Sequence, residues 1–243
     1  MNRDPGFRDF GVDVLVKLGG SLLADFDRAR ALGETLSELA TTHRVLVFPG
    51  GGPIDNYIEM VDRVLRFPAD VHHQLCARAQ DQTGLMFSTL CPGSRVFSRP
   101  VEVPSVLAEG RVAIMLPMEQ IIGLDVFERS WTTTSDSTAA WFARFFGARR
   151  FAILTDVPGI RRPGDADGAC LESLTTAEAA AMGRTGIDEC LPPFLEANGM
   201  SCTILDGRDH LSVENWFQGL PAPGTLVHPV GAPAPGKARS FSA

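Results

Sequence analysis

The sequence has few lysines, no closely paired cysteines and no long apolar run. Its two lysines are Lys17 and Lys237, and arginine supplies the other twenty basic residues. The five cysteines are widely spaced without a Cys-x-x-Cys pair, which argues against a disulfide framework or a zinc site and favours buried, reduced thiols. No run approaches the roughly 18 apolar residues of a transmembrane helix, and the residues after Met1 lack the apolar stretch of a secretion signal.

The charge balance also excludes some classes of protein. A net charge of −7 and a pI near 5.2 argue against a general nucleic-acid binder, which carries a basic face. With 44% apolar and 21% charged residues, the composition is that of an ordinary globular protein. We expect a single domain over residues 1–228 and a flexible Pro/Gly-rich tail over 229–243, in a cytoplasmic protein without nucleic-acid or membrane partners.

Apolar runs alternate with amphipathic segments along the chain. Strands are predicted at 13–18, 44–48, 95–97, 112–115, 151–154, 202–205 and 224–227. Helices are predicted at 27–39, 54–65, 71–90, 105–109, 137–146, 175–182, 191–198 and 212–218, and an exposed loop or hairpin at 161–168. Unbroken apolar strands between helices indicate an α/β protein with a mainly parallel sheet covered on both faces. Ligands then bind beyond the carboxyl ends of the strands.

Two of these strands end in glycine turns. The first reads Lys17-Leu18-Gly19-Gly20-Ser21, and the second ends in Gly50-Gly51-Gly52. Glycine lets the backbone approach a phosphate closely, so the two turns and Lys17 predict an anion cradle. The alternative is a plain strand–turn–helix whose lysine points to solvent. Neither turn matches a Walker A loop or the dinucleotide Gly-x-Gly-x-x-Gly pattern.

Two later motifs carry carboxylates. Asp136 stands in a hydroxyl-rich run before a predicted helix, where it is either the N-cap or a group that orients a lysine or holds Mg²⁺. Thr155-Asp156 follows another strand and leads into a Pro158-Gly159 turn, which is either an Asx-turn or part of a nucleotide site.

In this order and spacing, the four motifs resemble those of the amino acid kinase superfamily, which includes acetylglutamate, aspartate and uridylate kinases. The resemblance covers residues 12–228 and implies a three-layer αβα sandwich of the carbamate kinase-like fold. It also implies that the two glycine turns flank the transferring phosphoryl group and that Asp136 positions the catalytic lysine. The roles it assigns fall on Lys17, Gly19, Gly20, Ser21, Gly50, Gly51, Gly52 and Asp136, with Thr155, Asp156 and Gly159 at the nucleotide.

Within the superfamily, several segments are similar to the small kinases of methanofuran biosynthesis, which act on a phosphorylated aminomethyl-furan methanol. These segments are Ala79–Gly84, Ser130-Trp131, Gly186–Pro192 and Leu205–Gly207. One departure concerns the second lysine with which several superfamily members bridge the donor phosphates. Here Arg184 is the candidate replacement, although arginine does not substitute freely for lysine.

The resemblance therefore predicts a Mg²⁺-dependent kinase that transfers the γ-phosphoryl group of ATP to a small anionic acceptor, such as a phosphate monoester of one-carbon cofactor biosynthesis. It also implies a homo-oligomer, a dimer or hexamer. Asp81 is a further candidate for acceptor binding, with a solvated side chain as the alternative. His72-His73 is not expected to bind metal, because adjacent helical residues point about 100° apart. The alternative function is a nucleotide-binding or molybdenum- or tungsten-storage protein on the same fold.

Overall fold

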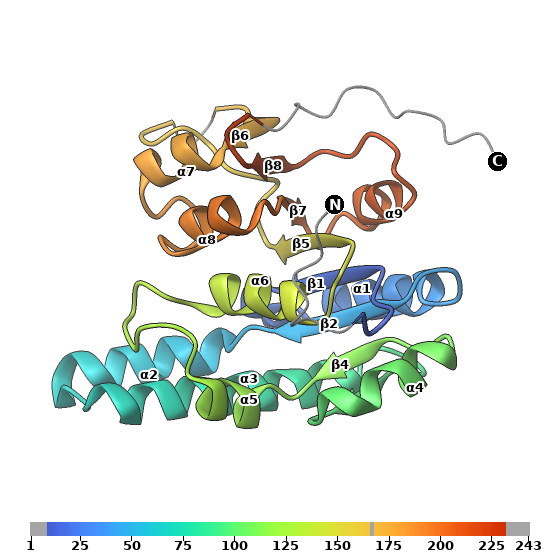
Figure 1. Cartoon of the computed structure of the whole chain (residues 1–243), viewed down its shortest axis with the longest axis horizontal. Helices are drawn as coiled ribbons and strands as arrows, with labels where there is room; N and C mark the ends of the chain where they lie inside the picture. The colour runs from blue at the N-terminus through green and yellow to red at the C-terminus, as the bar shows by residue number, and fades with distance from the viewer. Residues whose placement is uncertain (1–8, 166–167, 232–243) are drawn as a thin grey trace.

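The computed structural model describes residues 9–165 and 168–231 of the chain. Within these residues, eight strands form one sheet in the order β3-β4-β2-β1-β5-β7-β8-β6 (Figure 1). Neighbouring strands are parallel except for the antiparallel pair β7 and β8. The strands are β1 (Val14–Leu18), β2 (Val45–Pro49), β3 (Arg95–Phe97), β4 (Ala113–Met115), β5 (Arg150–Thr155), β6 (Ser173–Thr175), β7 (Cys202–Asp206) and β8 (Thr225–His228).

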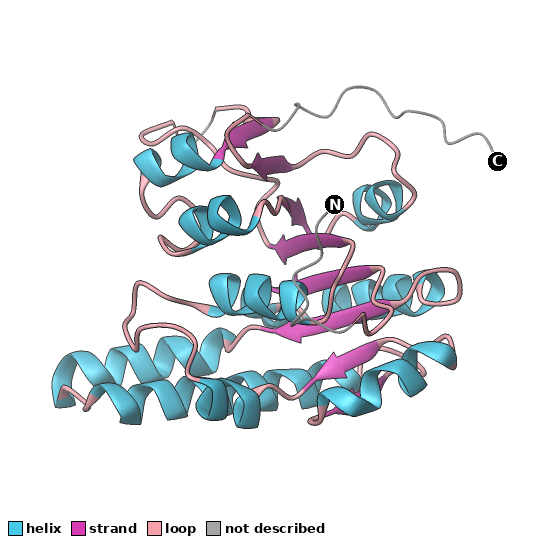
Figure 2. Cartoon of the chain, viewed as in Figure 1, coloured by secondary structure: helices cyan, strands magenta, loops and turns pink. Residues whose placement is uncertain are grey.

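Helices connect the strands and cover both faces of the sheet (Figure 2). The α-helices are α1 (Phe26–Leu39), α2 (Gly52–Leu65), α3 (Ala69–Ser88), α4 (Val103–Ala108), α5 (Met118–Leu124), α6 (Ser135–Phe145), α7 (Thr176–Met182), α8 (Leu191–Asn198) and α9 (His210–Phe217). Two short 3₁₀ helices, η1 (Gly20–Ala24) and η2 (Pro100–Glu102), precede α1 and α4. Helices α2 and α3 are long and extend beyond the sheet (Figure 1).

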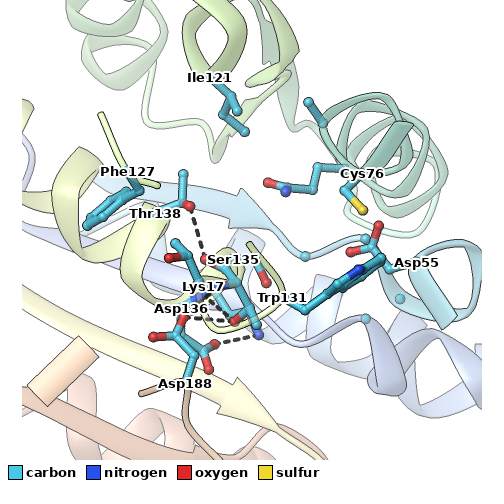
Figure 3. Close-up of a pocket in the computed structure, with 18 of the residues that line it drawn as sticks. Lys17, Asp55, Cys76, Ile121, Phe127, Trp131, Ser135, Asp136, Thr138 and Asp188 are labelled. Carbon is cyan, nitrogen blue, oxygen red and sulfur yellow. Dashed lines mark hydrogen bonds and ion pairs between the residues drawn. The ribbon is translucent and has the colours of Figure 1, made fainter. Parts of the chain in front are cut away.

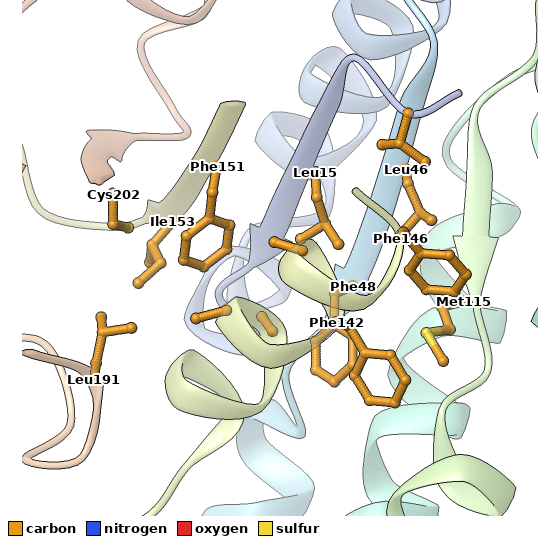
Figure 4. Close-up of a cluster of buried hydrophobic side chains, with 14 of the residues drawn as sticks. Leu15, Leu46, Phe48, Met115, Phe142, Phe146, Phe151, Ile153, Leu191 and Cys202 are labelled. Atoms are coloured by element: carbon orange, nitrogen blue, oxygen red, sulfur yellow. The ribbon is translucent and has the colours of Figure 1, made fainter. Parts of the chain in front are cut away.

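Side-chain alternation along the central strands creates two apolar cores. In β1, Leu15 packs into the core beneath α6 (Figure 4), whereas Val14 and Val16 pack into the core shared with α1 and α9. Successive side chains of a strand point to opposite faces, so unbroken apolar runs can serve both cores. The result is the predicted three-layer α/β sandwich with a mainly parallel sheet, and that prediction is confirmed.

The sheet register brings the glycine turns together. Leu18, the last residue of β1, pairs with Pro49 of β2 on one side and with Leu154 of β5 on the other. The turns that follow these three strands therefore leave the sheet at one edge, its carboxyl edge. Lys17 points to the same face as Leu15, two residues earlier, which is the face that α6 covers.

The alternation of strands and helices follows the sequence-based prediction, with boundaries shifted by a few residues. Helix α5 and strand β6 were not among the predicted elements. The described part of the 161–168 segment is a loop as predicted, while residues 166–167 and most of the predicted tail lie outside the described residues. Among the described helices, none has the length and apolar character needed to cross a membrane.

Candidate active site

A cavity of about 570 Å³ lies at the carboxyl edge of the sheet. Its lining comes from both glycine turns, from α2, α3 and α5, and from the segments around residues 130–136 and 184–188. This volume falls in the range of small-molecule sites. Figure 3 shows Lys17 and Asp136 close together, with Asp55, Cys76 and Trp131 to one side of them.

Lys17 and Asp136 form a nearly buried ion pair. The Lys17 Nζ lies 2.8 Å from Asp136 Oδ1, and the two side chains are 12% and 8% exposed. The pairing follows from the fold, since Lys17 projects from β1 toward α6 and Asp136 lies in the first turn of that helix. A charge-assisted contact of this kind holds the ammonium in one position. The sequence-based expectation that the two residues meet agrees with this geometry.

The N-cap of α6 is Thr134, not Asp136. Thr134 Oγ1 accepts the amide N–H of Asp136 at 3.3 Å, so the alternative interpretation of Asp136 as the N-cap is wrong. Capping by Thr134 leaves the Asp136 carboxylate free to face Lys17. A carboxylate in the first turn is also stabilised by the positive end of the helix dipole.

The two glycine turns touch each other. A Cβ on Gly20 would lie 2.0 Å from the Gly52 Cα, and Gly52 has a φ of +62°, so this approach requires glycine at both positions. Gly51 has a different close neighbour, a side chain instead of backbone. A Cβ there would lie 2.0 Å from the Asp55 carboxylate, which therefore packs directly against the second turn.

Asp188 is a buried site residue that the sequence analysis missed. Its carboxylate accepts hydrogen bonds from the Thr134 amide and hydroxyl, each at 2.9 Å, and from the Ser137 amide at 3.0 Å and hydroxyl. It also accepts the amides of Cys190 and Leu191. Burial and the nearby Asp136 charge raise the pKa of Asp188. Asp188 thus ties the 188–191 turn to the start of α6. Asp188 stands two residues before Cys190, the N-cap of α8, so no capping pattern in the sequence points to it.

The remaining predicted site residues divide into two groups. The cavity lining includes Gly50, Ser21, Asp156 and Arg184. Gly19, Thr155, Gly159 and Asp81 lie outside it.

The structure gives a physical reason for three of these exclusions. The Gly19 amide donates to the Leu154 carbonyl at 2.7 Å, which argues against the expected contact with phosphate. Gly159 packs against Thr225 of β8. Asp81 accepts the Met118 amide at 2.9 Å at the start of α5, so its carboxylate is engaged in joining α3 to α5, and its contact with the acceptor stays a prediction.

The far wall of the cavity is aromatic and acidic. The Trp131 ring stacks on His72 at 5.1 Å between centroids, and its Nε1 donates to Asp62 at 2.7 Å. Burial raises the pKa of Asp55 to about 6 and lowers that of His73. Within residues 9–165 and 168–231, no group of three or more His, Cys, Asp and Glu side chains could hold a metal ion.

Comparison with known proteins decides the family. The model of the amino acid kinase family matches residues 14–206, most of the chain. The chain belongs to this family. It is therefore a kinase, as the motifs predicted.

Individual relatives agree with the family. The (5-(aminomethyl)furan-3-yl)methyl phosphate kinase of Methanocaldococcus jannaschii is 27% identical over 209 residues, covering 84% of this kinase and 93% of the relative. An acetylglutamate kinase of Oleidesulfovibrio alaskensis is 24% identical over 259 residues, covering 84% and 87%. The uridylate kinase of Archaeoglobus fulgidus superposes with a TM-score of 0.69 at 21% identity, covering 89% and 100%, and so shares the fold.

Proposed function

We propose that this kinase transfers the γ-phosphoryl group of Mg²⁺-ATP to a phosphate monoester on a small molecule. The observation that carries the proposal is the Lys17–Asp136 ion pair, held at 2.8 Å between two touching glycine turns in a cavity of ligand size. In the transfer, the γ-phosphorus–oxygen bond of ATP breaks, ADP leaves, and a new phosphorus–oxygen bond forms to an oxygen of the acceptor phosphate. The acceptor becomes a diphosphate.

Lys17 is the residue with a direct electrostatic role. Phosphoryl transfer needs positioning and charge stabilisation more than covalent chemistry, because charge spreads over the oxygens of the transferred group. We propose that such charge develops next to the Lys17 ammonium. Asp136 holds this ammonium in position, and the positive charge itself comes from Lys17. Arg184, which is exposed and lines the same cavity, would supply a second cation.

The glycine turns and the helix start shape the phosphate end. Gly20 and Gly52 let two backbone segments meet around one anion, and α6 directs its N-terminal dipole toward the same place. Asp156 lines the cavity beside the β5 turn, where a nucleotide would lie. The described residues offer no cluster that could bind a metal ion. We therefore propose that Mg²⁺ enters the site bound to the phosphates of ATP and neutralises their negative charge.

The acceptor class rests on the relative from Methanocaldococcus jannaschii, whose name identifies an aminomethylfuran phosphate as its substrate. This similarity extends over 93% of that relative. The same compound is therefore the first acceptor to test.

The test is a transfer assay with ATP, Mg²⁺ and this phosphate monoester, following ADP release and the diphosphate product by ³¹P NMR. We expect Lys17→Ala to lower kcat by about 10²–10³, the loss caused by removing one preorganised charge-stabilising donor. Arg111→Ala is the matched control, because Arg111 is exposed and precedes β4 at the opposite edge of the sheet. Full activity in Lys17→Ala would refute the role of Lys17, and the absence of any diphosphate from the wild type would refute the function.

We also propose that the kinase is a homo-oligomer. Tyr57, Met60 and Val64 lie along one stripe of α2 and are 63%, 55% and 77% exposed. Monomeric proteins seldom leave a contiguous stripe of large apolar side chains in water, so a second copy is the proposed cover.

A further inference from the structure

Three polar side chains in the lining of the cavity have buried oxygens without a partner among the described residues. They are Asp55 of α2, Gln80 of α3 and Gln120 of α5, and in each case one side-chain oxygen lacks a hydrogen bond within the described residues. Gln80 is the most enclosed, with only 6% of its surface exposed. Nearly all buried polar atoms in native proteins are hydrogen-bonded. These oxygens therefore indicate that a bound group supplies the missing donors.

Asp55 and Gln80 lie on the same wall. The Cys76 thiol donates to the Asp55 carboxylate, and Gln80 lies one helical turn after Cys76 on α3. One further turn along this face, the Thr83 hydroxyl donates to the Gly51 carbonyl at 3.3 Å. This face of α3 thus runs along the second glycine turn and brings the Gln80 amide to the Asp55 end. Figure 3 shows Asp55 beside Cys76.

The charge at this end selects the kind of ligand. Glu59, one turn after Asp55, is already paired with Arg63 at 2.8 Å. Lys17 is the cation that acts on Asp55, but its ammonium is bound to Asp136 at 2.8 Å. Asp55 is thus a largely buried carboxylate without a counter-ion of its own among the described residues. An anionic ligand here would be repelled, and a cationic one would supply what is missing.

The amides agree with this assignment. A glutamine amide can present its oxygen or its nitrogen to a ligand. Beside a carboxylate, a ligand that donates hydrogen bonds makes use of the oxygens of both glutamines. A primary ammonium group has three N–H donors and no acceptor, which matches one carboxylate and two amide oxygens.

Trp131 adds a flat surface next to this wall (Figure 3). Its ring is held by the stack on His72 and by the bond from Nε1 to Asp62. A fixed aromatic face binds a planar ring by stacking and attracts a nearby cation. It therefore suits a ligand in which an amine is attached to a flat ring.

We propose that Asp55, Gln80 and Gln120 form a subsite for the protonated primary amine of the acceptor, beside the face of Trp131. This inference rests on the proposed function and extends it. The acceptor is zwitterionic, with its phosphate toward Lys17 and its amine toward Asp55. These three residues determine specificity and do not take part in the transfer.

The experiment compares two acceptors that differ in one group: the aminomethylfuran phosphate and its counterpart with a hydroxymethyl group in place of the aminomethyl group. For the wild type we expect kcat/KM to favour the amine by about 10²-fold or more. In Asp55→Asn this preference should fall by about 10- to 100-fold, the usual effect of losing a hydrogen bond to a charged group. Glu34→Gln is the control and should keep the preference, because Glu34 is an exposed residue of α1 that does not line the cavity.

A binding measurement separates this inference from the proposed function. Calorimetric titration of each compound without ATP requires no turnover. Tighter binding of the amine by the wild type, lost in Asp55→Asn, supports the subsite even where no phosphoryl transfer to either compound is found, an outcome that refutes only the function. Equal binding of the two compounds by the wild type, or an unchanged preference in Asp55→Asn, overturns the subsite.

Discussion

Asp55 should destabilise the free kinase, and the size of that effect follows from its pKa. Burial raises the pKa from 3.8 to about 6, against the smaller opposing effects of the Cys76 thiol, the Gly51 amide and Lys17, while Glu59 adds to the rise. The charged form is therefore disfavoured in the folded protein. At pH 8 the carboxylate is ionised in both the folded and the unfolded chain, and the difference amounts to at most about 3 kcal/mol of lost stability. Asp55→Asn removes the charge and should raise the free energy of unfolding by about 1–3 kcal/mol.

The pH dependence gives the sharper test. Below both pKa values the carboxyl is neutral in either state, so the advantage of asparagine must shrink as the pH falls through 6, to about 1 kcal/mol at pH 4.5. Urea unfolding of wild type and Asp55→Asn at both pH values measures this difference. Glu34→Gln, an exposed change on α1, should have little effect at either pH. Lower stability of Asp55→Asn at pH 8 would refute the reasoning, because it would mean that the free protein already compensates the charge.

Further expectations concern the residues around Lys17 and Asp55. Asp136→Asn should lower kcat by about 10²-fold, measured in the transfer assay, because the buried ammonium loses its counter-charge. Asp188→Asn should lower the free energy of unfolding by about 1–3 kcal/mol in urea, since several buried donors lose a charged acceptor. Gly51→Ala should displace the Asp55 carboxylate, so a double-mutant cycle with Asp55→Asn on amine preference should be strongly non-additive. Val64→Glu should reduce the mass of the assembly in light scattering; an unchanged mass would exclude the α2 stripe as its interface.

The end of the cavity that holds Lys17 and the glycine turns could be predicted, because these residues lie at the ends of strands. A buried strand fixes the face of the sheet toward which each side chain points, and parallel strands end at the same edge. Lys17 and the glycine turns are therefore expected to lie together at that edge. The position of Asp136 could be predicted for a related reason, because the helix that covers this face of the sheet begins above the same edge. Gly19 shows the limit, since pairing of its amide with Leu154 depends on how far β5 extends.

The end of the cavity that holds Asp55 and Gln80 could not be predicted, because these residues lie on helices and the packing of the helices decides what each side chain faces. Leu65 stands two turns after the buried Ile58 on α2, yet it is 63% exposed because that end of the helix projects beyond the sheet. Gln80 shows the opposite case, a polar residue that the packing of helices buries. A glutamine in an amphipathic helix is expected in water, but the contact between α3 and the second glycine turn buries it. No local pattern distinguishes such a residue from a solvated one.

In the free protein, the charges at one end of the cavity are balanced, whereas the other end carries an unbalanced negative charge. This difference explains how one pocket could bind a zwitterion. At the first end, Lys17 is paired with Asp136, so in the proposed function a bound phosphate would add negative charge for Mg²⁺ and Arg184 to balance. At the second end, Asp55 has no counter-ion among the described residues, so binding of an ammonium there would remove an existing cost. An acceptor that carried only phosphate would gain the first interaction and leave the second penalty in place. Discrimination against such an acceptor then requires no steric barrier, because the unpaired carboxylate supplies it.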